Sequence, residues 1–216
     1  MRNLLLILLL VLPRVAQAHP HVFIQTAVAV LFDDKDLATG IRVTWGYDDF
    51  TTLQYLADNG MDQDMDGMLT DEELAKLTGF DMHWIPGYLG DSYATLNETP
   101  LTLSNPRDPT LTYTDGKVTT THIRDFATPV QLGKAVLKLQ TYDPTLYVDY
   151  EMSPDVALVG ASPSQRCQVI FRPADTAKAK KELEAAVKAM SQDAESDFPR
   201  MGKRFASEAW VICASN

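Results

Sequence analysis

Short segments rich in β-branched residues recur along this chain, each bounded by turn residues, and they restrict the possible folds severely. Residues 22–32 and 37–47 are long apolar segments on either side of the polar turn 33–36, which predicts a β-hairpin. Further predicted strands are residues 93–96, 101–103, 111–113, 118–126, 135–142, 147–151, 167–171 and 209–213. Many short strands at regular spacing are typical of a β-sandwich.

The pattern changes to helical preference in two parts of the chain. Residues 48–57 favour a helix capped by Asp48 or Asp49, and a second helix is expected from Asp71 into the Trp84 region. Residues 174–190 form a late amphipathic helix that could pack through Leu183. We therefore expect an α+β, mainly β fold: an antiparallel β-sandwich with an EF-hand-like helix-loop-helix inserted at about residues 48–90. Residues 19–216 would form a single β-rich domain.

The first eighteen residues have the pattern of a signal peptide. Arg2 precedes an apolar run over residues 4–12, and Ala16-Gln17-Ala18 fits the small-x-small rule for cleavage. A retained membrane anchor is the alternative, but a spanning helix needs about 20 apolar residues. We expect cleavage after Ala18, export to the periplasm, and no insertion of the mature protein into the membrane.

The charge balance excludes some classes of partner. The sequence has 19 Lys and Arg against 29 Asp and Glu, a net charge of −10. Because residues 1–18 hold two of the basic residues and no acidic one, the mature chain carries −12. Nucleic acids and anionic membrane surfaces need a positive protein face, so neither is an expected partner. An acidic protein suits the handling of cations.

The sequence contains two cysteines, Cys167 and Cys213. In an oxidising compartment two thiols far apart in sequence usually pair, so we predict a disulfide that pins the last strand. Two buried free thiols or a pair of thiolate metal ligands are the alternatives. Neither cysteine has a Cys or His close enough in sequence to form a chelating pair, which favours the disulfide.

Residues 62–73 match the pattern of an EF-hand calcium loop at every specified position. Ca²⁺ requires six to eight oxygen ligands, and alternate residues of a tightly curled loop point inward. Asp62, Asp64 and Asp66 would each present a carboxylate, and Gly67 would permit the sharp turn around the ion. A solvated acidic loop is the alternative. It is disfavoured because the clustered carboxylates would repel one another without a cation.

The second half of the loop completes the predicted coordination. Met68 would offer its backbone carbonyl, Thr70 would bind directly or through a water, and Glu73 would supply both carboxylate oxygens. Gly60 lies where an EF-hand continues its incoming helix, and no second EF-hand is present in the sequence. We therefore expect weak binding, with a Kd of about 10⁻⁴–10⁻³ M, and a structural role.

A second candidate metal site lies at the predicted new amino terminus. A free α-amino group has a pKa of about 7.7–8.0, so it can lose its proton and chelate a metal together with the His19 imidazole. His21 could add a third nitrogen, while Pro20 lacks the amide N–H that a square-planar copper clamp uses. The alternative is that both histidines are solvated residues beside the cleavage site.

His122 and the carboxylates Asp143 and Asp149 are the remaining candidates for this site. Three nitrogens and a carboxylate suit Zn²⁺, Ni²⁺ or Cu²⁺, and the sequence does not choose among them. For His122 the residues alone favour an ordinary strand histidine over a ligand.

Three motifs together resemble the family catalogued as domain of unknown function 1007. They are residues 18–24 (Ala-His-Pro-His-Val-Phe-Ile), the Asp-x-Asp-x-Asp-Gly loop, and residues 142–149 (Tyr-Asp-Pro-Thr-Leu-Tyr-Val-Asp). Leu146 departs from the aromatic residue that is common in the family. The resemblance extends to the late cysteine pair. It implies a periplasmic component of an uncharacterised ABC-type transport system for zinc, nickel or cobalt, with His19, His21 and Asp149 as metal ligands.

Three functions follow as hypotheses. The first is a calcium-binding accessory of a transition-metal transporter. The second is a calcium-stabilised structural or interaction module with no transition-metal role. The third, a copper-dependent oxidase, has little support, because the sequence has no Gly-rich phosphate loop, no G-x-S-x-G motif and no reactive Cys-His arrangement. We therefore expect no enzymatic activity.

Overall fold

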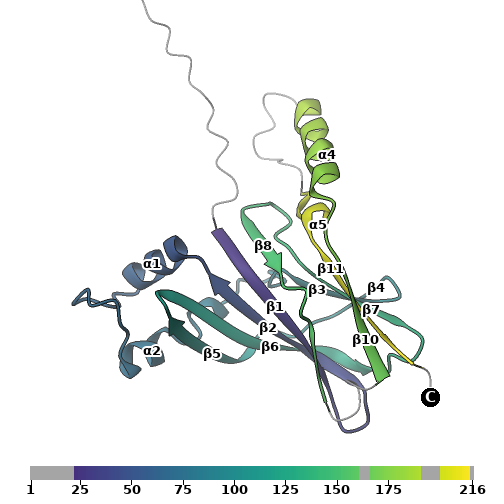
Figure 1. The fold of residues 1–216 in the computed structure, drawn as a ribbon, viewed down its shortest axis with the longest axis horizontal. Helices are drawn as coiled ribbons and strands as arrows, with labels where there is room; N and C mark the ends of the chain where they lie inside the picture. Colours follow the sequence, from purple (N-terminus) through teal and green to yellow (C-terminus); the bar gives the residue numbers. More distant parts are fainter. Residues whose placement is uncertain (1–21, 161–165, 191–199, 215–216) are drawn as a thin grey trace, which may run out of the picture.

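A computed structural model of the chain describes residues 22–160, 166–190 and 200–214, and within them the fold is mainly β (Figure 1). The larger sheet has the strand order β5-β6-β2-β1-β8, with β9 also paired to β1. Its strands are β1 (Val22–Phe32), β2 (Ala38–Tyr47), β5 (Arg107–Thr114), β6 (Lys117–Val130), β8 (Val148–Met152) and β9 (Ala157–Val159).

The smaller sheet has the strand order β10-β11-β7-β3-β4. Its strands are β3 (Ser92–Leu96), β4 (Thr99–Leu101), β7 (Val136–Thr141), β10 (Cys167–Arg172) and β11 (Glu208–Cys213). Leu137, Leu139 and Val211 of this sheet are buried in the same hydrophobic cluster as Val30 and Val43 of the larger one. The inner faces of the two sheets therefore share one core.

The predicted first hairpin is present. β1 and β2 pair antiparallel from Ile24 with Tyr47 to Phe32 with Ala38. Alternate residues of β1 are buried, which is the two-residue period of a strand with one face in the core. Asp33 Oδ1 accepts hydrogen bonds from the backbone N–H groups of Lys35 and Leu37, so an aspartate closes the turn.

The expectation of a wholly antiparallel arrangement is wrong at β1. This strand pairs in parallel with β8, from Val22 with Val148 to Thr26 with Met152, and also in parallel with β9. β8 follows β7, a strand of the other sheet, so it reaches the edge of the larger sheet through a crossover and not through a hairpin. A crossover allows the parallel direction that a tight turn forbids.

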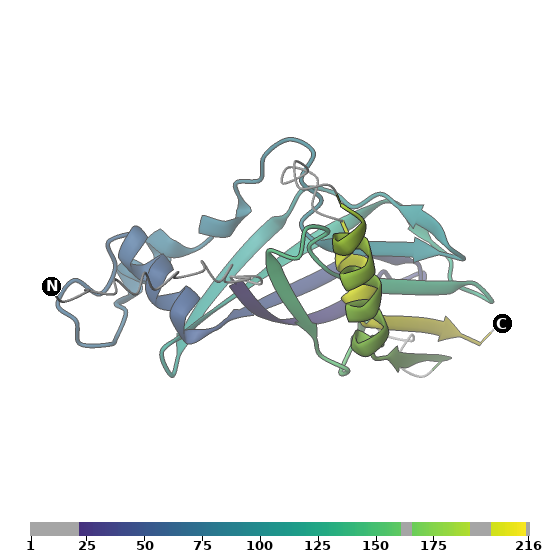
Figure 2. The ribbon, with the colours of Figure 1, turned by 90° about the horizontal axis from the view of Figure 1, so that it is seen from above.

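The segment between β2 and β3 contains α1 (Asp49–Asp58), α2 (Asp71–Leu77) and the 3-10 helix η1 (Phe80–Met82). Figure 2 shows α1 and α2 at one end of the molecule. The second helix is shorter than predicted. It ends at Leu77, because Gly79 follows with a φ of 83° that no α-helix can accommodate.

The C-terminal part of the described chain contributes α4 (Thr176–Ala189) and α5 (Gly202–Phe205). Asp175 caps α4 by accepting a hydrogen bond from the Lys178 N–H, and Ala179 is buried on its inner face. No helix within the described residues is both long enough and apolar enough to cross a membrane.

The predicted disulfide between Cys167 and Cys213 is confirmed. The two cysteines lie directly opposite each other on the antiparallel strands β10 and β11. Among the described strands, β10 lies at the edge of the sheet and pairs with β11 alone. The disulfide therefore fixes one end of an edge strand that would otherwise be held only by its backbone hydrogen bonds to β11.

Candidate metal centre

The loop of residues 59–70 connects α1 to α2, and a side chain caps the start of each helix. Asp48 caps the start of α1 by accepting a hydrogen bond of 2.7 Å from the Thr51 N–H. α1 ends at Asp58, and Gly60 follows with a φ of 63°. The incoming helix therefore stops before the loop begins, as Asn59-Gly60 in the sequence indicated.

Three carboxylates of the loop converge. Asp62, Asp64 and Asp66 each place one oxygen within 4.8 Å of the others. Asp62 is half-buried, whereas Asp64 and Asp66 are exposed to solvent. Asp62 reaches its position through a left-handed backbone with a φ of 49°. The spacing of two residues between aspartates thus brings their carboxylates together, as predicted.

Gly67 supplies the turn that folds the loop back on itself. Its φ is +75°, and a Cβ at this position would meet no atom within 4 Å, so the backbone conformation and not space requires glycine. The Gly67 N–H donates a hydrogen bond of 3.3 Å to Asp62 Oδ1. The Met68 N–H donates one of 2.8 Å to Asp66 Oδ1. These bonds hold two of the carboxylates against the loop backbone.

Glu73 joins the two ends of the loop. Its Oε1 accepts a hydrogen bond of 2.9 Å from the Asp62 N–H, and its Oε2 accepts bonds from the backbone N–H and the hydroxyl of Thr70. Thr70 and Glu73 together form a capping box at the start of α2. The hydrogen bonds from Thr70, followed by the one from Asp62, lower the pKa of Glu73. The carboxylate that the spacing predicted as the closing ligand is therefore held ionised.

The remaining predicted ligands line one depression beside the carboxylates. Its volume is about 410 Å³, and Asp64, Asp66, Met68, Thr70 and Glu73 lie on its walls with Gln63 and Leu69. Five of the six predicted calcium ligands thus line this depression, and Asp62 joins Asp64 and Asp66 in the carboxylate cluster beside it.

The candidate ligand His122 lies in the hydrophobic core. It is fully buried on β6 and packs edge-on against the rings of Trp45 and Trp84, at centroid distances of 4.8 and 5.6 Å. Neither ring nitrogen has a hydrogen-bond partner among the described residues. Burial, followed by the positive charge of Arg124, lowers its pKa to about 4. The environment is that of a neutral core histidine.

Asp149 lies on the opposite face of the same sheet. It pairs with Phe23, whose side chain is 50% exposed, whereas the neighbouring pair Tyr150 and Ile24 points into the core. His122 pairs with the buried Val43 and so faces inward. Two side chains on opposite faces of a sheet cannot bind the same ion, so His122 and Asp149 do not belong to one metal site.

The other two candidate ligands, His19 and His21, lie outside the described residues. The candidates for the terminal chelate that the structure describes are His122, Asp143 and Asp149. Asp143 is engaged locally: its carboxylate accepts hydrogen bonds from the Thr145 N–H and hydroxyl and from the N–H groups of Tyr147 and Val148. It therefore closes the turn before β8.

The structure also contains a buried polar cluster that the sequence did not predict. Asp91 accepts hydrogen bonds from the hydroxyls of Tyr88 and Tyr150, at 2.9 and 3.0 Å. Arg124 donates to the Leu89 carbonyl and lies 4.9 Å from the centre of the Trp84 ring. Burial raises the pKa of Asp91 to about 6. A charged residue at an inward position of a strand, as Arg124 is, was the one signal available in the sequence.

Comparison with known proteins places the chain among relatives of unknown activity. Residues 4–213 match the model of a family described as "Protein of unknown function (DUF1007)". No curated protein matches the chain. The family match covers nearly the whole sequence, so it supports the resemblance seen in the motifs, but it assigns no activity.

Proposed function

Because this chain belongs to the DUF1007 family of proteins of unknown function, we propose a role from its own geometry: it binds one Ca²⁺ in the loop 62–73. The ion stabilises the segment between β2 and β3. The observation that carries the proposal is the convergence of Asp62, Asp64 and Asp66, whose oxygens lie within 4.8 Å of one another.

The chemistry of the donor set supports calcium. Ca²⁺ is a hard cation that prefers carboxylate and carbonyl oxygens in flexible arrangements, and the predicted ligands offer oxygen only. The loop contains no His and no Cys, the ligands that zinc and copper most often use, which disfavours these metals there. The same proposal interprets α1, the loop and α2 as an EF-hand-like insertion into a β-sandwich.

Coupling to the rest of the fold follows from the positions of the ligands. Thr70 and Glu73 begin α2, and Leu77 at the end of that helix is buried in the core. Tyr55 of α1 packs against Phe80 at a centroid distance of 4.7 Å. An ion that orders the loop therefore orders both helices. An exported, periplasmic location, with which the disulfide is compatible, would expose the site to extracellular calcium.

Thermal unfolding in calcium and in chelator tests the proposal. For a Kd of about 10⁻⁴–10⁻³ M, Ca²⁺ at about 10 mM stabilises the folded chain by about 1–3 kcal/mol. A domain of this size gains roughly 2–4 °C in Tm for each kcal/mol, so we expect a rise of about 3–10 °C. Mg²⁺ should produce a smaller shift because it demands a tighter octahedral site.

Asp64→Asn is the most informative variant. Asp64 is exposed and forms no hydrogen bond among the described residues, so removing its charge leaves the fold without calcium intact. The calcium shift should nevertheless shrink strongly, because one carboxylate ligand is lost. Asp58→Asn, an exposed aspartate at the end of α1, is the matched control and should keep the full shift. Equal shifts in both variants, or no shift in the natural chain, would refute calcium binding here.

The alternative role, as an accessory that passes a transition metal to a membrane transporter, stays a prediction. It depends on His19 and His21, which lie outside the described residues, and the two other candidate ligands, His122 and Asp149, lie on opposite faces of the sheet. Of the hypotheses considered, the geometry supports the calcium-stabilised module best.

A further inference from the structure

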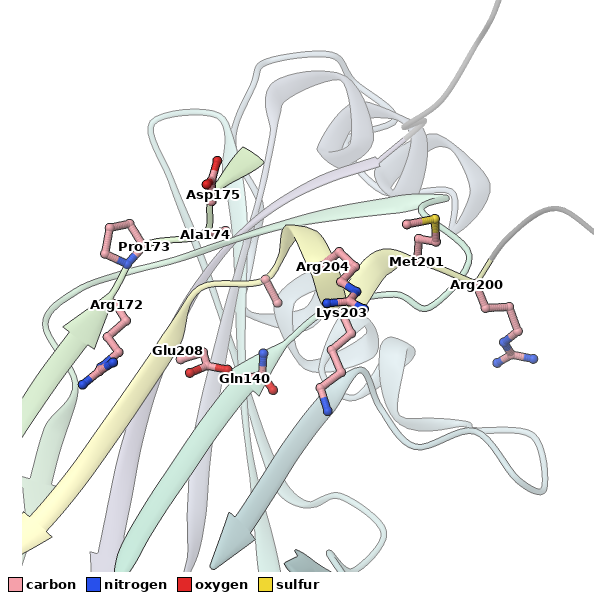
Figure 3. Close-up of a pocket in the computed structure, with 11 residues that line it drawn as sticks. Gln140, Arg172, Pro173, Ala174, Asp175, Arg200, Met201, Lys203, Arg204 and Glu208 are labelled. Carbon is pink, nitrogen blue, oxygen red and sulfur yellow. The ribbon is translucent and has the colours of Figure 1, made fainter. Parts of the chain in front are cut away.

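A second cavity, of about 780 Å³, lies on the smaller sheet, far along the chain from the calcium loop. Its lining comes from β7, β10, β11, α5 and the segments beside them (Figure 3). We call it the basic cavity, defined by Gln140, Arg172, Pro173, Ala174, Asp175, Arg200, Met201, Lys203, Arg204, Ala206 and Glu208.

The floor of the basic cavity is the face of the smaller sheet that points away from the core. On β7, Gln140 alternates with Leu137 and Leu139, both of which are buried in the core. On β11, Glu208 alternates with the buried Ala209, and it pairs with Arg172 of β10. Three neighbouring strands thus present polar side chains to one cavity.

Gln140 places a neutral amide at the basic cavity. The residue as a whole is only 5% exposed, yet its amide atoms are not among the buried polar atoms that lack a partner, so they reach the solvent at the cavity. No described residue forms a hydrogen bond with this amide, so both its donor and its acceptor are available to a ligand in the cavity.

The wall of the basic cavity is α5, which is fixed by a close backbone approach. The Gly202 N–H donates a hydrogen bond of 3.2 Å to the Pro144 carbonyl. A Cβ on Gly202 would lie 1.8 Å from the Asp143 carbonyl oxygen, so only glycine fits. This contact seats Lys203 and Arg204 opposite the strands, and Figure 3 shows Gln140 and Glu208 between them and Arg172.

The charges of the basic cavity are opposite to those of the chain as a whole. Four cationic side chains and two acidic ones line it, in a protein of net charge −10. Both acidic groups are already engaged. Asp175 caps α4, and Glu208 accepts a hydrogen bond from Trp210 Nε1 and lies 3.7 Å from the Lys138 ammonium.

Of the four cations, only Arg204 forms an ion pair among the described residues, with Glu182 at 3.5 Å. Among the described residues, neither Arg172 nor Lys203 has a carboxylate within ion-pair distance. Arg172 lies 3.7 Å from the centre of the Trp210 ring, a cation–π contact that orients the guanidinium without neutralising it. An oriented guanidinium presents parallel donors that match a carboxylate or a phosphate.

We propose that the basic cavity binds a small anionic ligand through a carboxylate or phosphate group held by Arg172 and Lys203, with Gln140 as a neutral hydrogen-bond partner. The volume lies within the range of about 300–1,000 Å³ that is usual for small-molecule sites. Pro173, Ala174, Met201 and Ala206 supply an apolar lining for the rest of the ligand. This inference is independent of the calcium proposal.

Calorimetric titration with two probes, inorganic phosphate and citrate, tests the inference at low ionic strength. The protein is first freed of calcium on a chelating resin, because both probes bind calcium. We expect one equivalent of at least one probe to bind, and binding of phosphate alone or citrate alone identifies the anionic group. Loss of a charge-assisted hydrogen bond in Arg172→Gln or Lys203→Gln should weaken binding by about tenfold or more.

Two controls distinguish a built site from general attraction. Arg42→Gln removes an exposed cation from β2 on the other sheet and should leave the affinity unchanged. Asp64→Asn should also leave it unchanged, which shows that no ion in the calcium loop mediates binding. The inference is overturned if neither probe binds, if Arg42→Gln weakens binding as much as Arg172→Gln, or if Asp64→Asn abolishes it.

Discussion

Raising the pH from about 4 to about 6.5 takes two buried groups, His122 and Asp91, through their titration, and they affect folding with opposite sign. Burial lowers the pKa of His122 to about 4 from its usual value near 6.5, so between these values the unfolded chain binds a proton that the folded chain does not. The free energy of unfolding therefore rises with pH. Burial raises the pKa of Asp91 to about 6, so in the folded chain it keeps a proton that the unfolded chain has released. That contribution falls as pH rises.

The two contributions are similar in size. One pKa unit corresponds to about 1.4 kcal/mol, so each group changes the free energy of unfolding by about 3 kcal/mol across its window. His122 is fully buried and Asp91 is 5% exposed, so solvent screening removes little of either. In the natural chain the contributions nearly cancel between pH 4 and 6, and each becomes visible only when the other group is removed.

The variants His122→Leu and Asp91→Asn separate the two groups. Leucine keeps the core apolar without titrating, and the asparagine carbonyl can still accept from the Tyr88 and Tyr150 hydroxyls. Relative to the natural chain, His122→Leu should lose about 3 kcal/mol of stability as the pH rises from about 4 to 6.5. Asp91→Asn should gain about as much over the window from about 4 to 6.

Urea unfolding at a series of pH values, in chelator and with the disulfide intact, measures these slopes. The comparison uses differences between variants, because Asp81, whose pKa is also raised by burial, contributes equally to each. A His122→Leu curve parallel to that of the natural chain would show that His122 does not titrate in this way, and the assignment of a neutral core histidine would fail.

Two further predictions concern the disulfide and the terminal histidines. Replacing Cys167 and Cys213 together by Ser opens a loop that the disulfide closes across 46 residues. In the chain-entropy model this should cost about 4 kcal/mol of folding stability and lower Tm by roughly 8–16 °C. An unchanged Tm in differential scanning calorimetry would contradict this prediction. A mature protein that starts at His19 should bind one Zn²⁺, Ni²⁺ or Cu²⁺ in calorimetry, and His19→Ala with His21→Ala should lose it. Equal binding with and without these histidines would remove the transition-metal hypothesis.

The sequence predicted those elements whose conformation depends on residues close together in the chain. β1 was expected at residues 22–32 and is found there, because alternation of buried and exposed residues is a property of the strand itself. The second helix was predicted to extend into the Trp84 region because the residues there are apolar. They are apolar because they pack against the sheet, and not because they belong to a helix. Trp84 covers the inner face of the larger sheet, stacked on Trp45 at 6.4 Å.

Long-range relations were beyond the reach of the sequence. β9 has only three residues, too few for a period, and it exists because β1 offers it backbone partners at Ala29 and Val30. The same distinction holds for the sites. The candidate calcium loop could be recognised in the sequence because all its predicted ligands lie within twelve residues. The basic cavity was not, because its residues come from strands and a helix that only the tertiary fold brings together.

The parallel pairing of β1 has a consequence for the order of folding. Val22 finds its partner Val148 only after more than a hundred intervening residues. A chain that emerges amino terminus first, from a ribosome or a translocation channel, cannot complete the larger sheet until most of its length is available. Non-local pairing of this kind slows folding to about milliseconds or seconds. The topology thus delays completion of the larger sheet until β8 is available.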